Sequence, residues 1–383
     1  MNAYISDVSF FLPNDPIGND EMESILGLAN DIPSRTRKII LRNNKIKTRY
    51  YAIDPASGRT THTNAQLAAE ALRRLQTAQG QALSGIECLC CGTSSPDQAM
   101  PGHASMVHGE LADSSPLEVV STAGICLSGI TALKYAAMNV AGGDCKTAAA
   151  TGSDLSSTYM RARICGGISP ERHEELTQKP ITSFEADFLR WMLSDGAGAV
   201  LITDRPAGEK LSLKIEWIDI VSLANSMETC MYAGAVKNEA GDLVGWRESA
   251  SLHEAVDQEV FPVKQDARLL NKTVIPTLVG KCLPGIVQKH GLRPEDIDWF
   301  LPHYSSEYFR QELYDGLEAI DFRIDFDKWF TNLTTKGNTG AASFYIMLEE
   351  LFHSGRLQKG QKIFAFIPES GRFSVGYMLM TVC

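Results

Sequence analysis

The stretch STAGICLSGITALKYAAMNVAGG, residues 121–143, contains one cysteine, Cys126, between two patterns. Small and β-branched residues precede Cys126, and a helical alternation of apolar and small residues follows it. We therefore expect Cys126 at the N-terminus of a helix, beside backbone N–H groups without helical partners. The helix dipole favours a thiolate there, so we expect a pKa below the usual value of about 8.5. Such a thiolate is a nucleophile suited to attack on thioesters.

The composition of the whole chain is that of a globular protein. Its 383 residues are 44% hydrophobic and 21% charged, enough for two domains or one duplicated unit. The net charge of −10 argues against nucleic acid or an anionic membrane as a partner. The N-terminal MNAYISDVSFFLPN lacks a basic segment followed by a long apolar run, and no apolar run is long enough to cross a bilayer. We expect a cytoplasmic protein with no membrane partner.

The nine cysteines show one cluster, Cys88, Cys90 and Cys91. Their C-x-C-C spacing has no second ligand pair at the distance that zinc sites use. We therefore expect a buried strand in which cysteine acts as a small hydrophobic residue, with no metal and no bound cofactor.

Short strand-like runs alternate with helical patterns along the chain, which is typical of an α/β fold with crossover connections. The predicted strands are 3–12, 86–94, 117–122, 147–155, 197–204, 213–221, 298–305, 362–369 and 374–382. The predicted helices are 64–78, a segment near 102–112, one from 126 onward, 271–291, and one from about 339.

The two parts of the chain repeat one series: a turn, a helix, a Gly turn, a strand, a turn and a Gly-containing strand. We predict two duplicated βαβαβ-type halves, residues 1–206 and 207–383. The two helix N-termini would then be equivalent, and Cys126 and Asn338 would face one central site. Residues 221–265 fit the alternation poorly, and we interpret them as an insertion near the substrate entrance.

Two further polar residues stand at the ends of predicted elements. His303 follows an apolar strand, at the kind of position where open α/β sheets bind ligands. Asn338 lies in a Gly-flanked turn at a helix start. Separately, His303 could be a hydrogen-bonded structural residue, Asn338 a helix cap and Cys126 a packing residue. Together they form a candidate nucleophile with two polar partners.

With these residues in place, the chain resembles the type III β-ketoacyl-acyl-carrier-protein synthases of the thiolase superfamily over nearly its whole length. Cys126, His303 and Asn338 match the family's Cys-His-Asn triad in type, order and context. The ordered set of motifs is specific to that family, and its other members are GTSSPDQAMPG (92–102), GSD (152–154), DGAGAV (195–200) and LEELFHSGRLQKGQKI (348–363). The resemblance implies a layered α-β-α-β-α structure.

It also implies the roles of these residues. Cys126 would accept an acyl group from coenzyme A or an acyl carrier protein, and a malonyl or β-ketoacyl thioester would then enter. His303 and Asn338 would stabilise the enolate left by loss of CO₂. The backbone N–H groups of Cys126 and of Gly371 or Arg372 would hold the oxyanion.

Other expectations concern the substrate surfaces. Phe188, Trp191 and Met192 are predicted to line the acyl tunnel, and Met100 matches a residue that the partner of a homodimer inserts into its neighbour's tunnel. The basic segment 34–49 could meet the phosphates of coenzyme A or an acidic carrier protein, or it could be a solvated face. Its candidate binding residues are Arg35, Arg37, Lys38 and Arg42.

Several positions depart from the family pattern. Tyr304, Ser305 and Ser306 follow the histidine, where the family has Gln-Ala-Asn, and the Gly-rich C-terminal turn has become Glu369-Ser370-Gly371-Arg372. With the insertion and the basic segment, these changes favour the specialised-metabolism branch that forms dialkylresorcinols or cyclohexanediones. The alternatives are a housekeeping fatty-acid initiation synthase, a thiolase or acyltransferase on the same fold, and an inert partner subunit.

Overall fold

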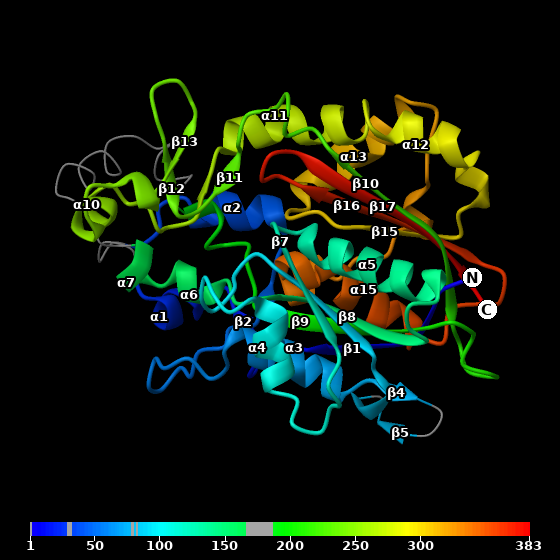
Figure 1. Ribbon diagram of the computed structural model, residues 1–383. Helices are drawn as coiled ribbons and strands as arrows, with labels where there is room; N and C mark the ends of the chain where they lie inside the picture. The colour runs from blue at the N-terminus through cyan, green and yellow to red at the C-terminus, as the bar shows by residue number, and fades with distance from the viewer. Residues whose placement is uncertain (1, 29–32, 78–79, 82, 166–186) are drawn as a thin grey trace.

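The computed structural model describes residues 2–28, 33–77, 80–81, 83–165 and 187–383. Its main feature is a nine-stranded mixed sheet in the order β15-β16-β17-β10-β1-β9-β8-β6-β7 (Figure 1). The strands are β1 (Tyr4–Phe11), β6 (Cys88–Thr93), β7 (Glu118–Ala123), β8 (Thr147–Asp154), β9 (Gly196–Thr203), β10 (Leu213–Ser222), β15 (Trp299–Pro302), β16 (Lys362–Glu369) and β17 (Ser374–Val382). Each coincides within a few residues with a strand predicted from the sequence.

The pairing pattern of the strands occurs twice. In one part β6 is parallel to β8, β8 is antiparallel to β9, and β9 is antiparallel to β1. In the other part β15, β16, β17 and β10 repeat these three relations in the same order. The two parts join through a short antiparallel contact, Tyr4 opposite Lys214 and Ile5 opposite Leu213. The division at residue 206 stays a prediction.

Three layers of helices enclose the two parts of the sheet (Figure 1). The central layer is α5 (Ser128–Gly142) and α15 (Ser343–Phe352), whose apolar residues pack on both parts in one core. The outer layers are α3 (Asn64–Arg73) with α4 (His103–Gly109) on the first part, and α11 (Ala267–Leu278), α12 (Leu283–His290) and α13 (Tyr308–Glu318) on the second. The predicted α-β-α-β-α order is confirmed.

The central layer needs close backbone contact. α15 is buried nearly all round, as expected of an apolar helix between two sheets. Gly129 of α5 and Gly152 of β8 lie against the carbonyl oxygen of Ala341, just before α15. A Cβ on these glycines would lie 2.4 and 2.1 Å from that oxygen. Glycine at both positions therefore lets the turn before α15 approach the helix that follows Cys126.

The helix predicted over 271–291 is two helices, so this expectation was wrong in its continuity. α11 ends at Leu278, and α12 begins at Leu283. Pro276 in the last turn of α11 has no N–H for the helical ladder, and a Cβ at Gly280 would lie 2.5 Å from the Pro276 carbonyl oxygen. The local backbone therefore favours a break between the two helices.

The predicted insertion carries small elements of its own at the side of the molecule away from the chain termini (Figure 1). In it, β11 (Met231–Tyr232) pairs with β14 (Lys264–Gln265), and β12 (Ala235–Lys237) pairs with β13 (Leu243–Gly245). α10 (Leu252–Asp257) lies between β13 and β14 in the chain. The other short elements are β2 (Ile17–Gly18), α1 (Met22–Leu26), α2 (Arg37–Asn44), β3 (Thr48–Arg49), β4 (Gln76–Thr77), β5 (Gly80–Gln81), α6 (Ser157–Met160), α7 (Ala162–Cys165) and α14 (Leu333–Lys336).

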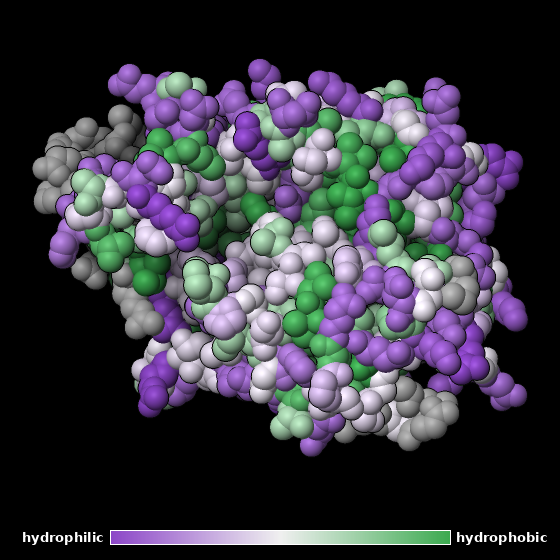
Figure 2. Space-filling model, viewed as in Figure 1, coloured by the Kyte–Doolittle hydropathy of each residue, from purple (hydrophilic) through white to green (hydrophobic). Residues whose placement is uncertain are grey.

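The three clustered cysteines, Cys88, Cys90 and Cys91, are fully buried in β6, where they pack as the sequence predicted. On the face shown in Figure 2, hydrophilic side chains cover most of the periphery and hydrophobic ones show in the hollowed middle. Among the described residues, no helix is long and apolar enough to cross a membrane.

Candidate active site

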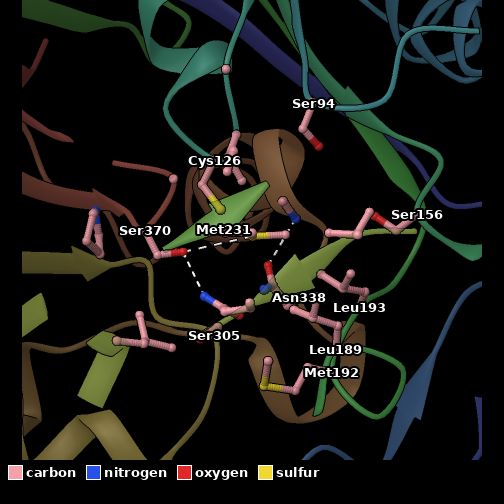
Figure 3. Close-up of a pocket in the computed structure, with 18 of the residues that line it drawn as sticks. Ser94, Cys126, Ser156, Leu189, Met192, Leu193, Met231, Ser305, Asn338 and Ser370 are labelled. Atoms are coloured by element: carbon pink, nitrogen blue, oxygen red, sulfur yellow. Dashed lines mark hydrogen bonds between the residues drawn. The ribbon is translucent and has the colours of Figure 1, made fainter. Parts of the chain in front are cut away.

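Cys126, His303 and Asn338 line one cavity of about 530 Å³, and Figure 3 shows the thiol of Cys126 and the amide of Asn338 in it. The three residues come from three places in the fold: the turn between β7 and α5, the end of β15, and the turn before α15. The structure therefore brings together the candidate triad that the sequence placed at separate element ends.

Cys126 lies just before Leu127, the N-cap residue of α5. The N–H groups on both sides of it are taken: those of Ile125 and Leu127 donate to Oε2 of Glu369, at 2.9 and 3.1 Å. Within the described part of the chain, the N–H of Cys126 itself has no bonded acceptor. That N–H lies near its own Sγ.

The expected lowering of the Cys126 pKa was wrong. Burial raises the pKa of the thiol well above its usual range, and the carboxylates of Glu369 and Asp154 raise it further. The helix dipole cannot offset these effects because a carboxylate already occupies the N–H groups at this helix start. Cys126 is therefore a neutral thiol at neutral pH in the unliganded protein.

His303 is held by the sheet. Its backbone N–H donates to the carbonyl oxygen of Phe366 in β16, at 2.8 Å, and its side chain is buried. Burial lowers the pKa of His303 to about 4. The imidazole is therefore neutral at neutral pH, with one ring nitrogen able to donate a hydrogen bond and the other able to accept one.

Asn338 is fixed through its backbone and through one side of its amide. Its N–H donates to the carbonyl of Met192 (2.9 Å), and its own carbonyl accepts from the N–H of Ser194 (2.8 Å). The side-chain Oδ1 accepts from the N–H of Gly340 at 3.0 Å. Because the oxygen is engaged, Nδ2 is the part of the amide available to donate to a ligand.

Asp154, the last residue of the GSD motif, supports the turn that carries Asn338, a role that the sequence did not reveal. This fully buried carboxylate accepts five hydrogen bonds, from Thr93 Oγ1, from the N–H and Oγ of Ser94, from Ser95 Oγ and from the N–H of Ala341. It also lines the cavity. Its only signal in the sequence was the match of the motif.

Gly371 and Arg372, the predicted oxyanion turn, line the same cavity. The insertion is hydrogen-bonded to this turn: the Gly371 carbonyl oxygen accepts hydrogen bonds from the N–H groups of Cys230 (2.8 Å) and Met231 (3.3 Å). Nε of Arg372 donates to the carbonyl of Met227 at 2.9 Å. Residues 221–265 thus form part of the cavity wall, and the lining residues they supply are Thr229, Met231, Tyr232, Ala233, Leu243, Val263 and Gln265.

Many of the residues that line the cavity are apolar. Of the three residues predicted here for the acyl tunnel, Met192 lines it (Figure 3). The sequence missed the rest, which are Met160, Leu189, Leu193, Leu270, Val274, Ile275, Phe309 and Leu313. The i, i+4 spacing on α11 and α13 was visible, but cavity-lining and core-facing residues share that spacing.

Phe188 and Trp191 are not among the residues that line this cavity, so their role in the acyl tunnel stays a prediction. Both are buried in the core. The indole of Trp191 donates from Nε1 to Ser34 Oγ at 3.2 Å and lies beneath the guanidinium of Arg37. Met100 is 74% exposed and does not line the cavity of its own protomer, so its role towards a partner stays a prediction.

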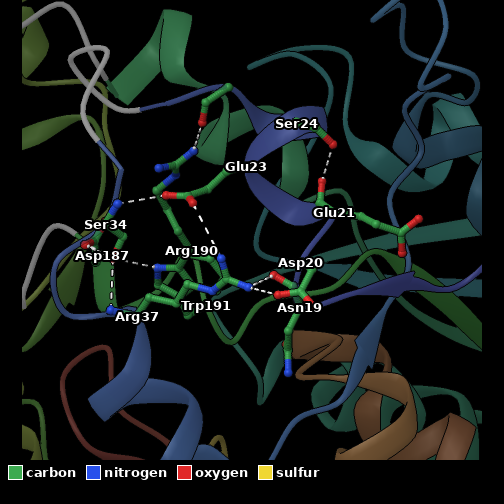
Figure 4. Close-up of polar contacts among 11 residues, drawn as sticks. Asn19, Asp20, Glu21, Glu23, Ser24, Ser34, Arg37, Asp187, Arg190 and Trp191 are labelled. Atoms are coloured by element: carbon green, nitrogen blue, oxygen red, sulfur yellow. Dashed lines mark hydrogen bonds and ion pairs between the residues drawn. The ribbon is translucent and has the colours of Figure 1, made fainter.

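The arginines and lysines of the basic segment 34–49 differ in their surroundings. Arg37 pairs with Asp20 and Glu23 and covers Trp191, and its role as a binding residue stays a prediction (Figure 4). Lys38 and Arg42 on α2, and Arg35 before it, are exposed. These three stay candidates for contacting an anionic carrier.

No group of three or more His, Cys, Asp or Glu side chains in the described ranges is arranged to hold a metal ion. The polar groups of the cavity include a thiol, an imidazole and an amide. Such a set suits covalent acyl transfer and the stabilisation of oxyanions.

Comparisons with known proteins show which proteins the chain is similar to in sequence and in fold. The family of the 3-oxoacyl-[acyl-carrier-protein (ACP)] synthase III C terminal matches residues 287–376. A β-ketoacyl-[acyl-carrier-protein] synthase III of Chlorobaculum tepidum is 24% identical over 367 residues, 95% of this chain and 94% of the relative.

Two solved structures extend the likeness over the whole fold. The tetronic acid condensing enzyme AbyA1 has a TM-score of 0.75 at 18% identity, covering 99% of each chain. OleA of Xanthomonas campestris, in a cysteine-to-serine variant with bound lauric acid and lauroyl-CoA, has a TM-score of 0.72 at 19% identity, covering 100% of this chain and 99% of that one. The resemblance and the fold are confirmed. The curated relatives, which are named as β-ketoacyl synthases, also support the expected class of enzyme, a carbon–carbon bond-forming acyltransferase.

Proposed function

We propose that this relative of the type III β-ketoacyl synthases loads an acyl group on Cys126 and condenses it with a malonyl or β-ketoacyl thioester, with loss of CO₂. The observation that carries the proposal is the meeting of Cys126, His303 and Asn338 in one cavity that apolar side chains also line. The relatives named as synthases and condensing enzymes support the reaction class.

The first step is acyl transfer. Sγ of Cys126 bonds to the acyl carbon, the bond from that carbon to the carrier sulfur breaks, and the thiol proton ends on the departing carrier thiolate. The N–H groups of Cys126 and the Gly371–Arg372 turn stabilise the oxyanion that forms in between. The apolar lining of the cavity receives the acyl chain, as supported by the lauric acid and lauroyl-CoA bound in OleA.

The second step is decarboxylative condensation. Nδ2 of Asn338 and a ring N–H of neutral His303 donate to the thioester oxygen of the extender. The bond to CO₂ breaks, and its electron pair enters the enolate that these donors stabilise. The enolate carbon then bonds to the acyl carbon, and the Cys126 thiolate leaves and takes a proton from water. No separate base is needed because loss of CO₂ itself produces the carbanion.

We place the product in specialised metabolism, as a polyketide-type compound that can close to a cyclohexanedione or resorcinol ring. The departures at Tyr304, Ser305 and Glu369 and the insertion in the cavity wall support this. A housekeeping initiation synthase and an acyltransferase on the same fold remain the alternatives. Acyl-CoA and acyl carrier protein are the proposed carriers, met by Arg35, Lys38 and Arg42.

We also propose a homodimer. Met100 is 74% exposed, and β7 lies at the end of the strand order in the described sheet, with one edge unpaired. Natural sheets rarely leave such an edge uncovered. Light scattering of the purified protein tests this directly, and a monomer at micromolar concentration would contradict it.

The test of function is the mass of the intact protein after incubation with acetyl, medium-chain, branched and aryl-unsaturated acyl-CoA. We expect one donor class to add its acyl mass to the wild type and no mass to Cys126→Ala. Cys383→Ala, which removes a half-buried thiol at the C-terminus, is the matched control and should load normally. A folded wild type that takes no acyl group from any CoA or carrier-protein donor would contradict the proposal.

A further inference from the structure

Two carboxylates at strand ends each bind a turn in the other part of the sheet. Asp154 ends β8 and accepts the N–H of Ala341 (2.7 Å), in the turn before α15. Glu369 ends β16 and accepts the N–H groups of Ile125 and Leu127, in the turn before α5. Because β8 and β16 hold the same place in the repeated pairing pattern, the two contacts form a reciprocal arrangement.

The contact made by Glu369 surrounds the nucleophile. One oxygen, Oε2, binds the N–H before Cys126 and the N–H after it, which leaves the backbone of Cys126 little freedom to rotate. Glu369 does not line the cavity and so has no direct access to the acyl group. Gly124 adds to the fit: with φ of 157°, it brings the turn so close that a Cβ there would lie 3.3 Å from Oε2.

We propose that Glu369 is a positioning residue for acyl transfer: by holding the N–H groups on both sides of Cys126, it presents the N–H of Cys126 to the substrate oxygen. The inference rests on the proposed function, because it assumes that Cys126 receives an acyl group. A donor fixed before the reaction stabilises an oxyanion better than one that must reorient.

The charge of Glu369 has a second consequence. A carboxylate beside the nucleophile disfavours the thiolate, and it is one of the groups that raise the pKa of Cys126. The residue therefore favours acyl transfer through geometry while it suppresses the free thiolate. These two effects move in opposite directions when the residue is changed, which separates a positioning role from a merely structural one.

The experiment compares Glu369→Ala and Glu369→Gln in two reactions of Cys126. Acylation by the preferred acyl-CoA needs the oxyanion donor, whereas alkylation by iodoacetamide does not. Glu369→Ala should acylate about 10- to 100-fold more slowly, while its alkylation at pH 8 does not fall. Glu369→Gln keeps an oxygen for both N–H groups without the charge, so it should recover most of the acylation rate.

The pH profile of alkylation should shift to lower pH by about half a unit or more in Glu369→Gln, because this carboxylate no longer disfavours the thiolate. Glu216→Gln is the matched control: that carboxylate binds Thr381, at the far end of β17, and does not line the cavity. It should match the wild type in both reactions.

Three outcomes would overturn the inference. An acylation rate of Glu369→Ala within about threefold of the wild-type rate would show that the contact of Glu369 with the two N–H groups is dispensable. Equal losses of acylation and alkylation would show a damaged turn rather than a lost donor. A pH profile of alkylation that is unchanged in Glu369→Gln would show that the charge of Glu369 does not affect the pKa of Cys126. Alkylation needs no acyl donor, so the effect of the Glu369 charge on Cys126 is still measured if the wild type accepts no acyl group and the proposed function fails.

Discussion

The turn before α5 and the turn before α15 make the same kind of contact with a carboxylate but present different functional groups. Each opens a central helix and donates backbone N–H to a carboxylate from the other part of the sheet. One turn presents a thiol, Cys126, and the other an amide, Asn338. Fold repetition therefore fixes where functional groups stand, whereas the local residue fixes what they do.

The two carboxylates differ in how completely they are bound. Asp154 is fully buried and accepts five hydrogen bonds, so it mainly holds structure. Glu369 is half-buried and accepts two through one oxygen. The difference indicates that the Asn338 turn depends on its carboxylate for stability, and the Cys126 turn depends on its carboxylate for reactivity.

The largest effect is expected from Asp154→Ala. Removing this buried acceptor leaves several donors without partners, which should lower the free energy of unfolding by about 3–5 kcal/mol. Urea unfolding followed by circular dichroism measures this. Glu369→Ala is the comparison and should lose clearly less stability. Equal losses in the two variants would contradict the distinction between the carboxylates.

Asn338→Ala tests the other side of the comparison. It removes the Nδ2 donor, so decarboxylation and condensation should fall about 100-fold or more, while loading of Cys126 continues. The acyl-enzyme mass and the rate of CO₂ release measure the two steps separately. A variant that loses loading as well as condensation would show that the two turns do not act independently.

The smallest effect is the pH dependence of the wild type. Because the pKa of Cys126 is raised, its thiolate fraction is small at neutral pH and should grow about tenfold per pH unit up to pH 9 without a plateau. The pKa of His303 is lowered to about 4, so no step from this residue should occur between pH 6 and 7. Iodoacetamide alkylation, with Cys126→Ala subtracted, measures the profile, and a plateau below pH 8 would contradict it.

The sequence predicted the nine main strands and both central helices because their residues alternate or repeat with clear periods. It also identified Cys126, His303 and Asn338, which stand at element ends where function is expected. The sequence could not decide the places of Phe188 and Trp191, because an apolar helix face looks alike whether it packs in a core or lines a cavity. It missed the ion pairs of Arg37 for a related reason: the partners Asp20 and Glu23 lie in a separate segment.

The order of elements, the duplicated pattern and the identity of the candidate nucleophile could be read from the chain, because they depend on local periodicity and on residue type. Three features could not be read from the chain. They are the neutral state of the thiol, the place of the insertion in the cavity wall, and the contacts that Glu369 and Asp154 each make with the other part of the sheet. Protonation, burial and hydrogen bonding depend on which distant residues meet in the fold. Ile125 and Glu369 are 244 positions apart in the chain, yet the N–H of one lies 2.9 Å from the carboxylate of the other.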